Sequence, residues 1–267
     1  MAGPEERAKI GLTITPTPRL VWQKAAVEAV TPETYRVKTF TLRPQEWRPF
    51  RPGQHFDVRL TAPDGYQAQR SYSIASEPER TGTFDLTVEL VDGGEVSPFF
   101  FDVVQPGDDI EVRGPIGGPF TWTVNDGGPA LFIAGGSGIV PIMSMLRHRT
   151  AMMAKQRGAP PPPALLLYSS RSPEDIIYRG ELDLMAAGDG SFQLFNTLTR
   201  KQPAGWSGYA RRLDRQMVAD CIVRLGVPKL TFICGPTGFV ETAAEATVGA
   251  GAAPASVRTE RFGPSGS

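Results

Sequence analysis

The chain has 267 residues, of which 40% are hydrophobic and 21% are charged. This composition is that of a folded globular protein and excludes a wholly disordered chain. The 28 lysine and arginine residues balance 28 aspartate and glutamate residues, and no basic run provides the electrostatic footprint of a nucleic-acid-binding protein. The 29 glycine and 25 proline residues favour a fold rich in turns and strands over a helical bundle.

Residue types that bind metals are scarce. Two cysteines, Cys221 and Cys234, cannot supply the four thiolates of an iron–sulfur cluster, and two histidines leave a structural zinc site without its usual ligands. A single pair of cysteines in a chain of this size also fits a reducing compartment. Residues 1–12 lack the apolar core of a signal peptide, and no apolar run reaches about 18 residues. We therefore expect a cytoplasmic, monomeric protein without a metal or a membrane span.

The first half of the sequence alternates between hydrophobic and polar residues, which is the period of β-strands. The alternation is clearest at residues 35–42, 55–60, 83–91 and 109–112. Turns that contain proline and glycine separate these segments. Several short strands joined by such turns predict an antiparallel barrel or sandwich.

The pattern changes after the glycine pair at residues 127–128. Continuous apolar runs, typical of strands buried on both faces, lie at residues 130–134, 164–168, 192–198 and 230–234. Helical segments are expected between them, at residues 139–150, 173–187 and 214–225. Alternating strands and helices predict a parallel sheet. We therefore expect two domains, a β domain at 16–124 and an α/β domain at 125–267.

Two segments have the composition of ligand-binding motifs. A glycine-rich turn of the form GxGxxP, at residues 134–141, lets a phosphate approach backbone N–H groups at the start of a helix. At residues 70–73 an arginine beside an aromatic residue can hold a phosphate and a flat ring. Taken alone, the first is also compatible with a tight turn that binds nothing. The second, taken alone, is better explained by an ordinary strand with a surface arginine.

Five short motifs follow one another along the chain. They are Arg-Ser-Tyr-Ser at 70–73, Gly-Glu-Val-Ser at 94–97, Gly-Pro-Ile-Gly-Gly-Pro-Phe at 114–120, Gly-Ser-Gly-Ile-Val-Pro at 136–141 and Cys-Gly-Pro at 234–236. In this order and spacing they resemble the ferredoxin–NADP reductase superfamily, in particular the reductase modules of bacterial oxygenases. The resemblance covers nearly the whole chain. It implies an N-terminal antiparallel flavin-binding β-barrel followed by a parallel-sheet α/β domain that binds NAD(P).

The resemblance implies a flavin site along the first two motifs. Arg70 would pair with the flavin phosphate, Tyr72 would lie along the isoalloxazine and ribityl, and Ser73 would hydrogen-bond near flavin N5. A strand of the barrel would border the ring through its backbone, and a helix start would hold the pyrophosphate. The flavin-binding residues implied in this way are Arg70, Ser71, Tyr72, Ser73, Val88, Glu89, Gly94, Glu95, Val96, Ser97 and Phe262.

The resemblance also implies a nicotinamide site at the end of the last apolar run. Cys234 would lie by the nicotinamide and position it rather than act as a nucleophile; the alternative is a small buried hydrophobic residue. Ser73, Cys234 and Glu260 are the catalytic residues implied. The residues implied to bind the nucleotide are Gly136, Ser137, Gly138, Pro141, Ser170, Arg171, Arg200, Arg212, Cys234, Gly235 and Pro236.

Three features depart from the family pattern. The four cysteines of the ferredoxin domain that oxygenase reductases often carry are absent, so electrons would go to a separate acceptor. A motif Trp-x-Gly-x-x-Gly-Arg appears at residues 206–212 with Arg211 in place of the second glycine, so the local turn should differ. Phe262 could place an aromatic ring near the flavin face, although a polar tail follows it.

The nucleotide is expected to be NADPH. Arg171 follows the second apolar run, where ligands of a parallel sheet lie, and an arginine there suits the 2′-phosphate. Arg200 and Arg212 could join it, or all three could be solvated surface residues. Glu174 and Asp175 leave NADH possible, because they could hold a ribose diol or neutralise Arg171. Two phosphate motifs in the barrel favour FAD, with FMN possible.

The reaction implied is hydride transfer from NAD(P)H to bound FAD, followed by transfer of single electrons to a separate protein: a ferredoxin, a haem monooxygenase or an oxygenase component. No histidine lies near a motif, so hydrolytic catalysis has no support. Two alternatives remain. The chain could be a free flavin or ferric reductase that releases its flavin, or a non-catalytic flavoprotein subunit of a larger complex.

Overall fold

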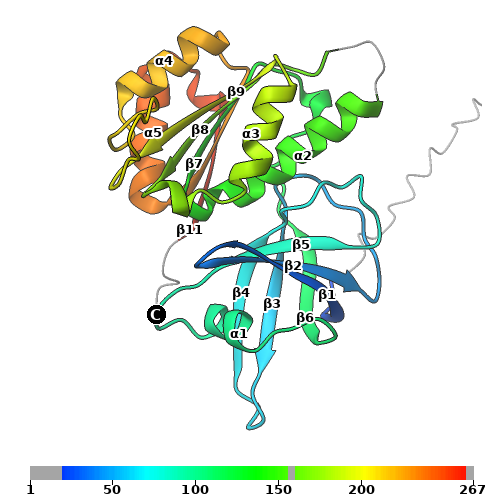
Figure 1. Ribbon diagram of the computed structural model, residues 1–267. Helices are drawn as coiled ribbons and strands as arrows, with labels where there is room; N and C mark the ends of the chain where they lie inside the picture. The colour runs from blue at the N-terminus through cyan, green and yellow to red at the C-terminus, as the bar shows by residue number, and fades with distance from the viewer. Residues whose placement is uncertain (1–19, 156–159, 263–267) are drawn as a thin grey trace, which may run out of the picture.

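The computed structural model describes residues 20–155 and 160–262, which form two lobes stacked one above the other (Figure 1). The lower lobe holds six antiparallel strands in the order β4-β3-β6-β1-β2-β5, and a bridge between Ile74 and Leu86 joins the two ends into a barrel. The strands are β1 Gln23–Thr34, β2 Val37–Pro44, β3 His55–Thr61, β4 Gln67–Ser73, β5 Phe84–Glu89 and β6 Asp109–Ile116.

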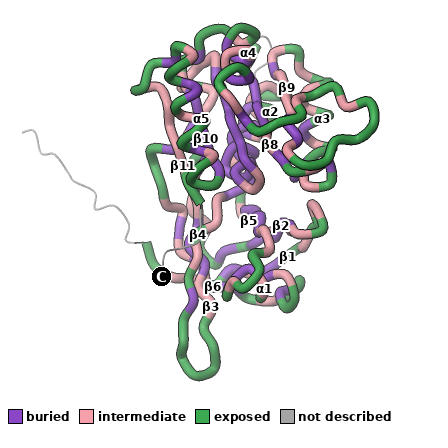
Figure 2. The backbone as a smooth tube through the Cα atoms, turned by 90° about the vertical axis from the view of Figure 1, so that its left-hand side faces the viewer, coloured by how far each residue is buried: buried purple, intermediate pink, exposed green. Residues whose placement is uncertain are grey.

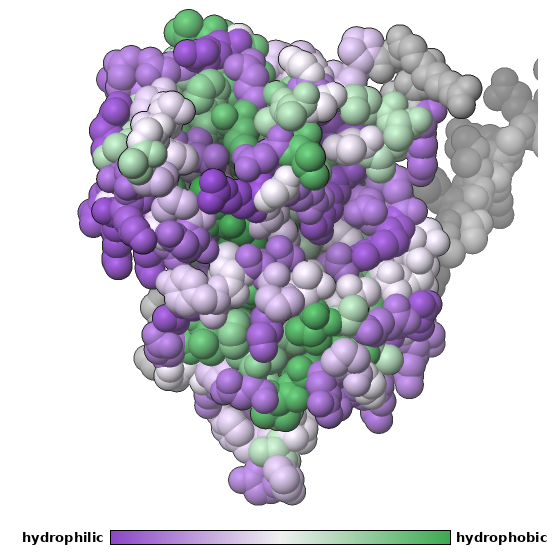
Figure 3. All heavy atoms as spheres, in the orientation of Figure 1, coloured by the Kyte–Doolittle hydropathy of each residue, from purple (hydrophilic) through white to green (hydrophobic). Residues whose placement is uncertain are grey.

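Alternating burial along the strands fills the barrel with apolar side chains. In β2, for example, Phe40 and Leu42 are fully buried while Thr41 between them is not. A short helix, α1 Val96–Asp102, packs its Phe100 ring against Phe40 with the ring centroids 4.9 Å apart. These side chains form one contiguous core. Figure 3 shows hydrophobic residues gathered on the outside of the same lobe, around α1.

The upper lobe holds five parallel strands in the order β11-β10-β7-β8-β9. The strands are β7 Ala130–Gly135, β8 Ala164–Ser170, β9 Phe192–Leu198, β10 Leu230–Pro236 and β11 Val257–Phe262. The helices are α2 Ile139–Lys155, α3 Arg179–Gly188, α4 Arg215–Leu225 and α5 Thr237–Gly249.

Helices cover both faces of this sheet, which explains its continuous apolar strands. Alternate residues of β7 enter different cores: Phe132 packs with α2 and α3, whereas Ile133 packs with α4 and α5. Figure 2 shows this buried centre in purple. The predicted barrel and parallel sheet are therefore confirmed. None of the helices in the described ranges is long and apolar enough to cross a membrane.

Some element boundaries differ from the sequence-based expectation. The first strand, β1, was not predicted, because its alanines, glutamates and two register shifts weaken the alternation. The helix expected at residues 173–187 is a 3₁₀ turn, Pro173–Asp175, followed by α3. Tyr178 separates the two with a left-handed φ of 58°. The predicted domain boundary falls at a 3₁₀ turn, Val124–Asp126, between the two sheets. Residues 16–19 and 263–267 of the predicted domains lie outside the described residues.

Candidate functional site

Three of the predicted residues converge where the two lobes meet. Ser73 ends β4 of the barrel, and its hydroxyl donates a hydrogen bond of 3.3 Å to Oε1 of Glu260 on β11. Glu260 lies opposite Cys234 in the pairing of β10 with β11. β11 extends from the upper lobe toward the barrel and approaches β4 in both views (Figures 1 and 2). The fold thus brings a hydroxyl, a carboxyl and a thiol from three separate strands to one place.

Burial controls the ionisation of this cluster. It raises the pKa of Glu260 from 4.5 to about 7, and the hydrogen bond from Ser73 opposes the shift only in part. Burial, together with the nearby Glu260 carboxylate, raises the pKa of the Cys234 thiol well above its ordinary value. Glu260 can therefore hold or release a proton near neutral pH, and Cys234 remains a thiol instead of a nucleophilic thiolate.

The glycine-rich turn contacts this cluster directly. It forms a 3₁₀ turn, Gly136–Gly138, between β7 and α2. Gly136 has a φ of +55° and open space around the position of a Cβ atom. A Cβ atom on Gly138 would lie only 2.1 Å from the carbonyl oxygen of Cys234. Gly138 is therefore required for the close packing of the turn on β10, and Gly136 is the glycine that leaves the turn open to a ligand.

Sequence reasoning missed two aromatic residues that support the turn. The hydroxyl of Tyr168, on β8, donates to the carbonyl oxygen of Gly136 at 3.1 Å. The ring of Phe239 lies within 3 Å of the Cβ positions of both Gly135 and Gly235, so these glycines make room for it. For Tyr168, the available signal was a tyrosine within an apolar strand, because a buried hydroxyl needs a hydrogen-bond partner.

Arg70 and residues 94–97 lie together on the barrel. The Nη2 atom of Arg70 is 3.4 Å from a carboxylate oxygen of Glu95, and the hydroxyl of Tyr66 donates to the other oxygen at 2.6 Å. The Arg70 side chain is 39% exposed, so it retains donors for an anionic group. Beyond Glu95 lies a cavity of about 540 Å³ that Tyr66 and Phe99 help to line. Arg70 therefore fits a phosphate group, whereas the cavity is lined in part by the carboxylates of Glu95, Asp109 and Glu111.

Of the other residues predicted to bind flavin, some have side-chain groups available to a ligand and others do not. Burial raises the pKa of Tyr72 to about 12, and its ring lies 5.8 Å from that of Phe100. The backbone N–H of Val91 donates to the Ser97 hydroxyl at 3.0 Å, which leaves the hydroxyl hydrogen free to donate. Two other predicted residues, Val88 and Val96, are core residues, and Ser71 is exposed but donates its hydroxyl hydrogen to Asp57.

The residues predicted to bind the nucleotide also include both buried and exposed residues. Pro141, Ser170 and Gly235 are buried, whereas Ser137 is the partly exposed middle residue of the glycine-rich turn. Arg171, Arg200 and Arg212 are exposed, and none has an ion pair among the described residues.

The acidic residues near Arg171 have partners of their own. Glu174 pairs with Lys201 at 3.5 Å, and Asp175 accepts a hydrogen bond from Tyr35 at 3.1 Å. The N–H of Arg200 donates to the carbonyl oxygen of Arg171 at 2.9 Å, which holds these two arginines next to each other.

The last predicted residues lie at the ends of the paired strands β10 and β11. Pro236 and Phe262 are partners in register, and Phe262 is 36% exposed. Arg211, the departure from the family motif, has no positive φ and pairs with Asp214 at 2.6 Å, so an arginine fits this turn.

Comparisons with known proteins identify the two domains. An FAD-binding oxidoreductase domain matches residues 25–121, and an NAD-binding oxidoreductase domain matches residues 132–245. The chain is 35% identical over 190 residues to ferredoxin–NADP reductase B of Sorangium cellulosum, covering 70% of this chain and 74% of that protein. It is 32% identical over 238 residues to the glycine betaine monooxygenase reductase subunit of Pseudomonas aeruginosa, covering 87% of this chain but only 62% of that protein.

A solved structure shares the fold. The ferredoxin–NADP⁺ reductase of Neisseria gonorrhoeae, which was solved with bound FAD and NADP, is 22% identical. The similarity covers 90% of this chain and 98% of that one, with a TM-score of 0.72. The predicted resemblance is therefore confirmed: the chain belongs to the ferredoxin–NADP reductase family, with an FAD-binding domain followed by an NAD-binding domain.

Proposed function

We propose that the chain is an NAD(P)H-dependent flavoprotein reductase that delivers electrons to a separate protein. The observation that carries this proposal is the hydrogen bond between Ser73 and Glu260, with Cys234 opposite Glu260. It joins the predicted flavin motif to the predicted nicotinamide motif across the lobe boundary. FAD, when bound, supplies a hydride acceptor that can then release electrons one at a time.

The three residues at the junction have different roles. Glu260 holds a proton near neutral pH, where a proton carrier works best. Ser73 orients that carboxyl and presents its hydroxyl at the end of β4. Cys234 is 1% exposed and supplies a small apolar contact that positions the nicotinamide.

The barrel motifs account for flavin binding. Arg70 pairs with a phosphate oxygen, and Tyr72 supplies an aromatic surface whose hydroxyl stays protonated. The N–H of Gly94 donates to the carbonyl oxygen of Val91, so residues 95–97 offer the backbone N–H groups and Ser97 its free hydroxyl hydrogen to the pyrophosphate. The match of residues 25–121 to an FAD-binding domain favours FAD over FMN.

The unpaired arginines support NADPH as the substrate. Arg171 lies beyond the carboxyl end of β8 and close to Arg200, so a 2′-phosphate there would meet two cations. Because Glu174 and Asp175 have partners of their own, neither neutralises Arg171 through an ion pair.

A separate electron acceptor is the remaining part of the proposal. The relative from Pseudomonas aeruginosa is described as the reductase subunit of a monooxygenase, and this chain spans about three fifths of it. We infer that the acceptor is a ferredoxin, a haem monooxygenase or an oxygenase component. Both cysteines are free and buried, which fits a monomer in the reducing cytoplasm.

Anaerobic single-turnover kinetics test this function. The protein is reconstituted with FAD, passed through gel filtration and mixed with NADPH or NADH. We expect the flavin to stay bound and to be reduced by both nucleotides, faster by NADPH, and Ser73→Ala to slow the reduction without releasing the flavin. Flavin that is lost on dilution would indicate a free flavin reductase. Flavin that is bound but not reduced would indicate a non-catalytic subunit.

A further inference from the structure

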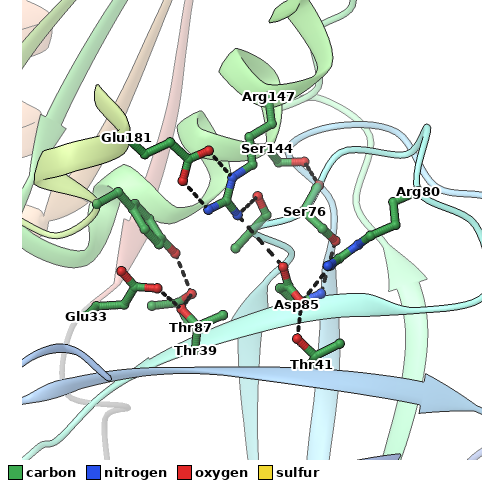
Figure 4. Close-up of polar contacts among 12 residues, drawn as sticks. Glu33, Thr39, Thr41, Ser76, Arg80, Asp85, Thr87, Ser144, Arg147 and Glu181 are labelled. Carbon is green, nitrogen blue, oxygen red and sulfur yellow. Dashed lines mark hydrogen bonds and ion pairs between the residues drawn. The ribbon is translucent and has the colours of Figure 1, made fainter. Parts of the chain in front are cut away.

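We propose that Arg147 is a positioning residue for hydride transfer, because it fixes the nucleotide-binding lobe against the flavin-binding barrel. This inference rests on the proposed function. The side chain of Arg147 is only 16% exposed and lies between the two lobes (Figure 4).

One set of contacts of Arg147 joins the two binding sites. Arg147 belongs to α2, the helix that begins at the glycine-rich turn. Its Nη1 atom donates to the carbonyl oxygen of Ala75 at 3.0 Å, two residues beyond Ser73 on the barrel side. Its Nε and Nη2 atoms donate to the carboxylate of Glu181 on α3, at 2.8 and 2.6 Å. A single guanidinium thus ties two helices of one lobe to the segment of the other lobe that directly follows Ser73 and β4.

A chain of hydroxyl groups makes a second connection across the boundary. The Tyr178 hydroxyl is hydrogen-bonded to Thr87 on β5, Thr87 is 2.8 Å from Thr39, and Thr39 donates to Glu33 at 2.7 Å. Each hydroxyl carries one hydrogen, so donation by Thr39 to Glu33 makes Thr87 donate to Thr39 and Tyr178 donate to Thr87. Figure 4 shows Glu33, Thr39 and Thr87 in this line.

Arg147 holds this second connection in place. Its guanidinium lies over the Tyr178 ring, 4.9 Å from the ring centroid. Ile177 directly precedes Tyr178 in the chain, and its N–H donates to the Tyr168 hydroxyl at 3.3 Å. The Tyr168 hydroxyl in turn donates to the carbonyl oxygen of Gly136. The connection therefore runs from β5 of the barrel to the glycine-rich turn.

The consequence concerns the distance between hydride donor and acceptor. Reacting atoms must lie roughly 3–3.5 Å apart, and a displacement of about 1 Å can slow a reaction about a hundred-fold. The donor is held by one lobe and the acceptor by the other. Because Arg147 makes its contacts on both sides, we expect its loss to widen the distribution of lobe positions and to slow hydride transfer while each lobe stays folded.

The chain offers a matched control on the same helix. Arg149 is 2% exposed and contacts the carbonyl oxygen of Pro162 at 2.9 Å, Ser191 at 2.6 Å and Asp189. All of these partners belong to the upper lobe. Arg147 and Arg149 each make three hydrogen bonds through the guanidinium, but none of those made by Arg149 crosses the boundary. A purely structural role of Arg147 predicts the same behaviour from Arg147→Lys and Arg149→Lys.

Two measurements distinguish these roles. Spin labels on Val103→Cys, directly after α1, and on Val223→Cys in α4, which are 54% and 84% exposed, report the distance between the lobes without any cofactor. The two native cysteines are buried and should not be labelled. Single-turnover reduction of bound FAD by NADPH reports hydride transfer. We expect Arg147→Lys to broaden the distance distribution and to slow the reduction at least ten-fold, with FAD affinity unchanged. We expect Arg149→Lys to lower the melting temperature without either effect.

A narrow, unchanged distance distribution in Arg147→Lys would overturn the proposal, and so would an unchanged reduction rate. If Arg147→Lys does not fold, Tyr178→Phe serves in its place, since it keeps the ring beneath the guanidinium and loses only the bond to Thr87. It should broaden the distribution and slow reduction about three-fold, and an unchanged distribution would again overturn the proposal. If the wild type fails to reduce FAD, the proposed function fails, whereas the spin-label distances still decide whether Arg147 fixes the lobes.

Discussion

Replacing Glu260 by glutamine should stabilise the protein in a pH-dependent way. Burial raises the pKa of Glu260 from 4.5 to about 7, so between these two pH values the folded chain keeps a proton that the unfolded chain has lost. The stability of the wild type therefore falls as the pH rises through this window and stays low above it. Glu260→Gln removes the titration and keeps an oxygen that can accept the hydrogen bond from Ser73.

The size of the effect follows from the same two values. At about 1.4 kcal/mol per pKa unit, the full difference corresponds to about 3 kcal/mol, and because Glu260 is only partly buried we expect about 1–3 kcal/mol. Nearly all of this is present at pH 8, and less than about 1 kcal/mol of it at pH 5. For a protein of this size, about 1 kcal/mol corresponds to about 2–4 °C in melting temperature.

Thermal unfolding at pH 5 and pH 8 checks this expectation. Glu260→Gln should melt about 2–10 °C above the wild type at pH 8 and much closer to it at pH 5. Glu245→Gln, an exposed carboxyl on α5, is the control and should show no such pH dependence. If Glu260→Gln and the wild type differ equally at both pH values, Glu260 titrates as an ordinary carboxylic acid and its assigned role is wrong.

Four further outcomes follow from the site. Arg70→Ala should weaken FAD binding about ten- to a hundred-fold, because a charge-assisted hydrogen bond contributes about 1.5–3 kcal/mol. Equilibrium titration with FAD measures this affinity, and a wild-type value would contradict the prediction. Cys234→Ala should slow single-turnover flavin reduction up to about a hundred-fold with flavin still bound, and an unchanged rate would leave Cys234 a core residue. Gly138→Ala should lower the melting temperature and also slow reduction, because its Cβ atom would meet the carbonyl oxygen of Cys234 at 2.1 Å. Arg171→Glu should lower the NADPH-to-NADH ratio of kcat/KM at least about ten-fold, mainly through KM, whereas a wild type that prefers NADH would remove Arg171 from the site.

The strands of the upper lobe were predictable because their burial on both faces requires continuous apolar sequences. Both faces of β8 and β10 lie under helices, so most residues at 164–168 and 230–234 are apolar and the two runs stand out. β1 gave no such signal, since its alanines and polar residues alternate weakly and its register shifts twice. The start of α3 depends on the left-handed backbone of Tyr178, a conformation that sequence periodicity does not indicate.

The site was predictable only through the order of the motifs. Ser73 and Glu260 are 187 residues apart, and no spacing or periodicity links them. The contacts of Arg147 were not predictable at all. In the sequence, a buried arginine on a helix cannot be distinguished from a solvated one, because its partners belong to another lobe. Likewise, the sequence does not distinguish Gly136, which has open space around it, from Gly138, which packs against β10. Only the surroundings of each glycine in the structure do so.

The most direct test of the account is stopped-flow mixing of the FAD-loaded protein with NADPH in the absence of oxygen. The account predicts that the absorbance of oxidised flavin disappears in a single turnover, more slowly with NADH, and that Ser73→Ala and Glu260→Gln slow this step while the flavin stays bound. Flavin absorbance that persists at saturating NADPH and NADH, in a protein that retains its FAD, would contradict it.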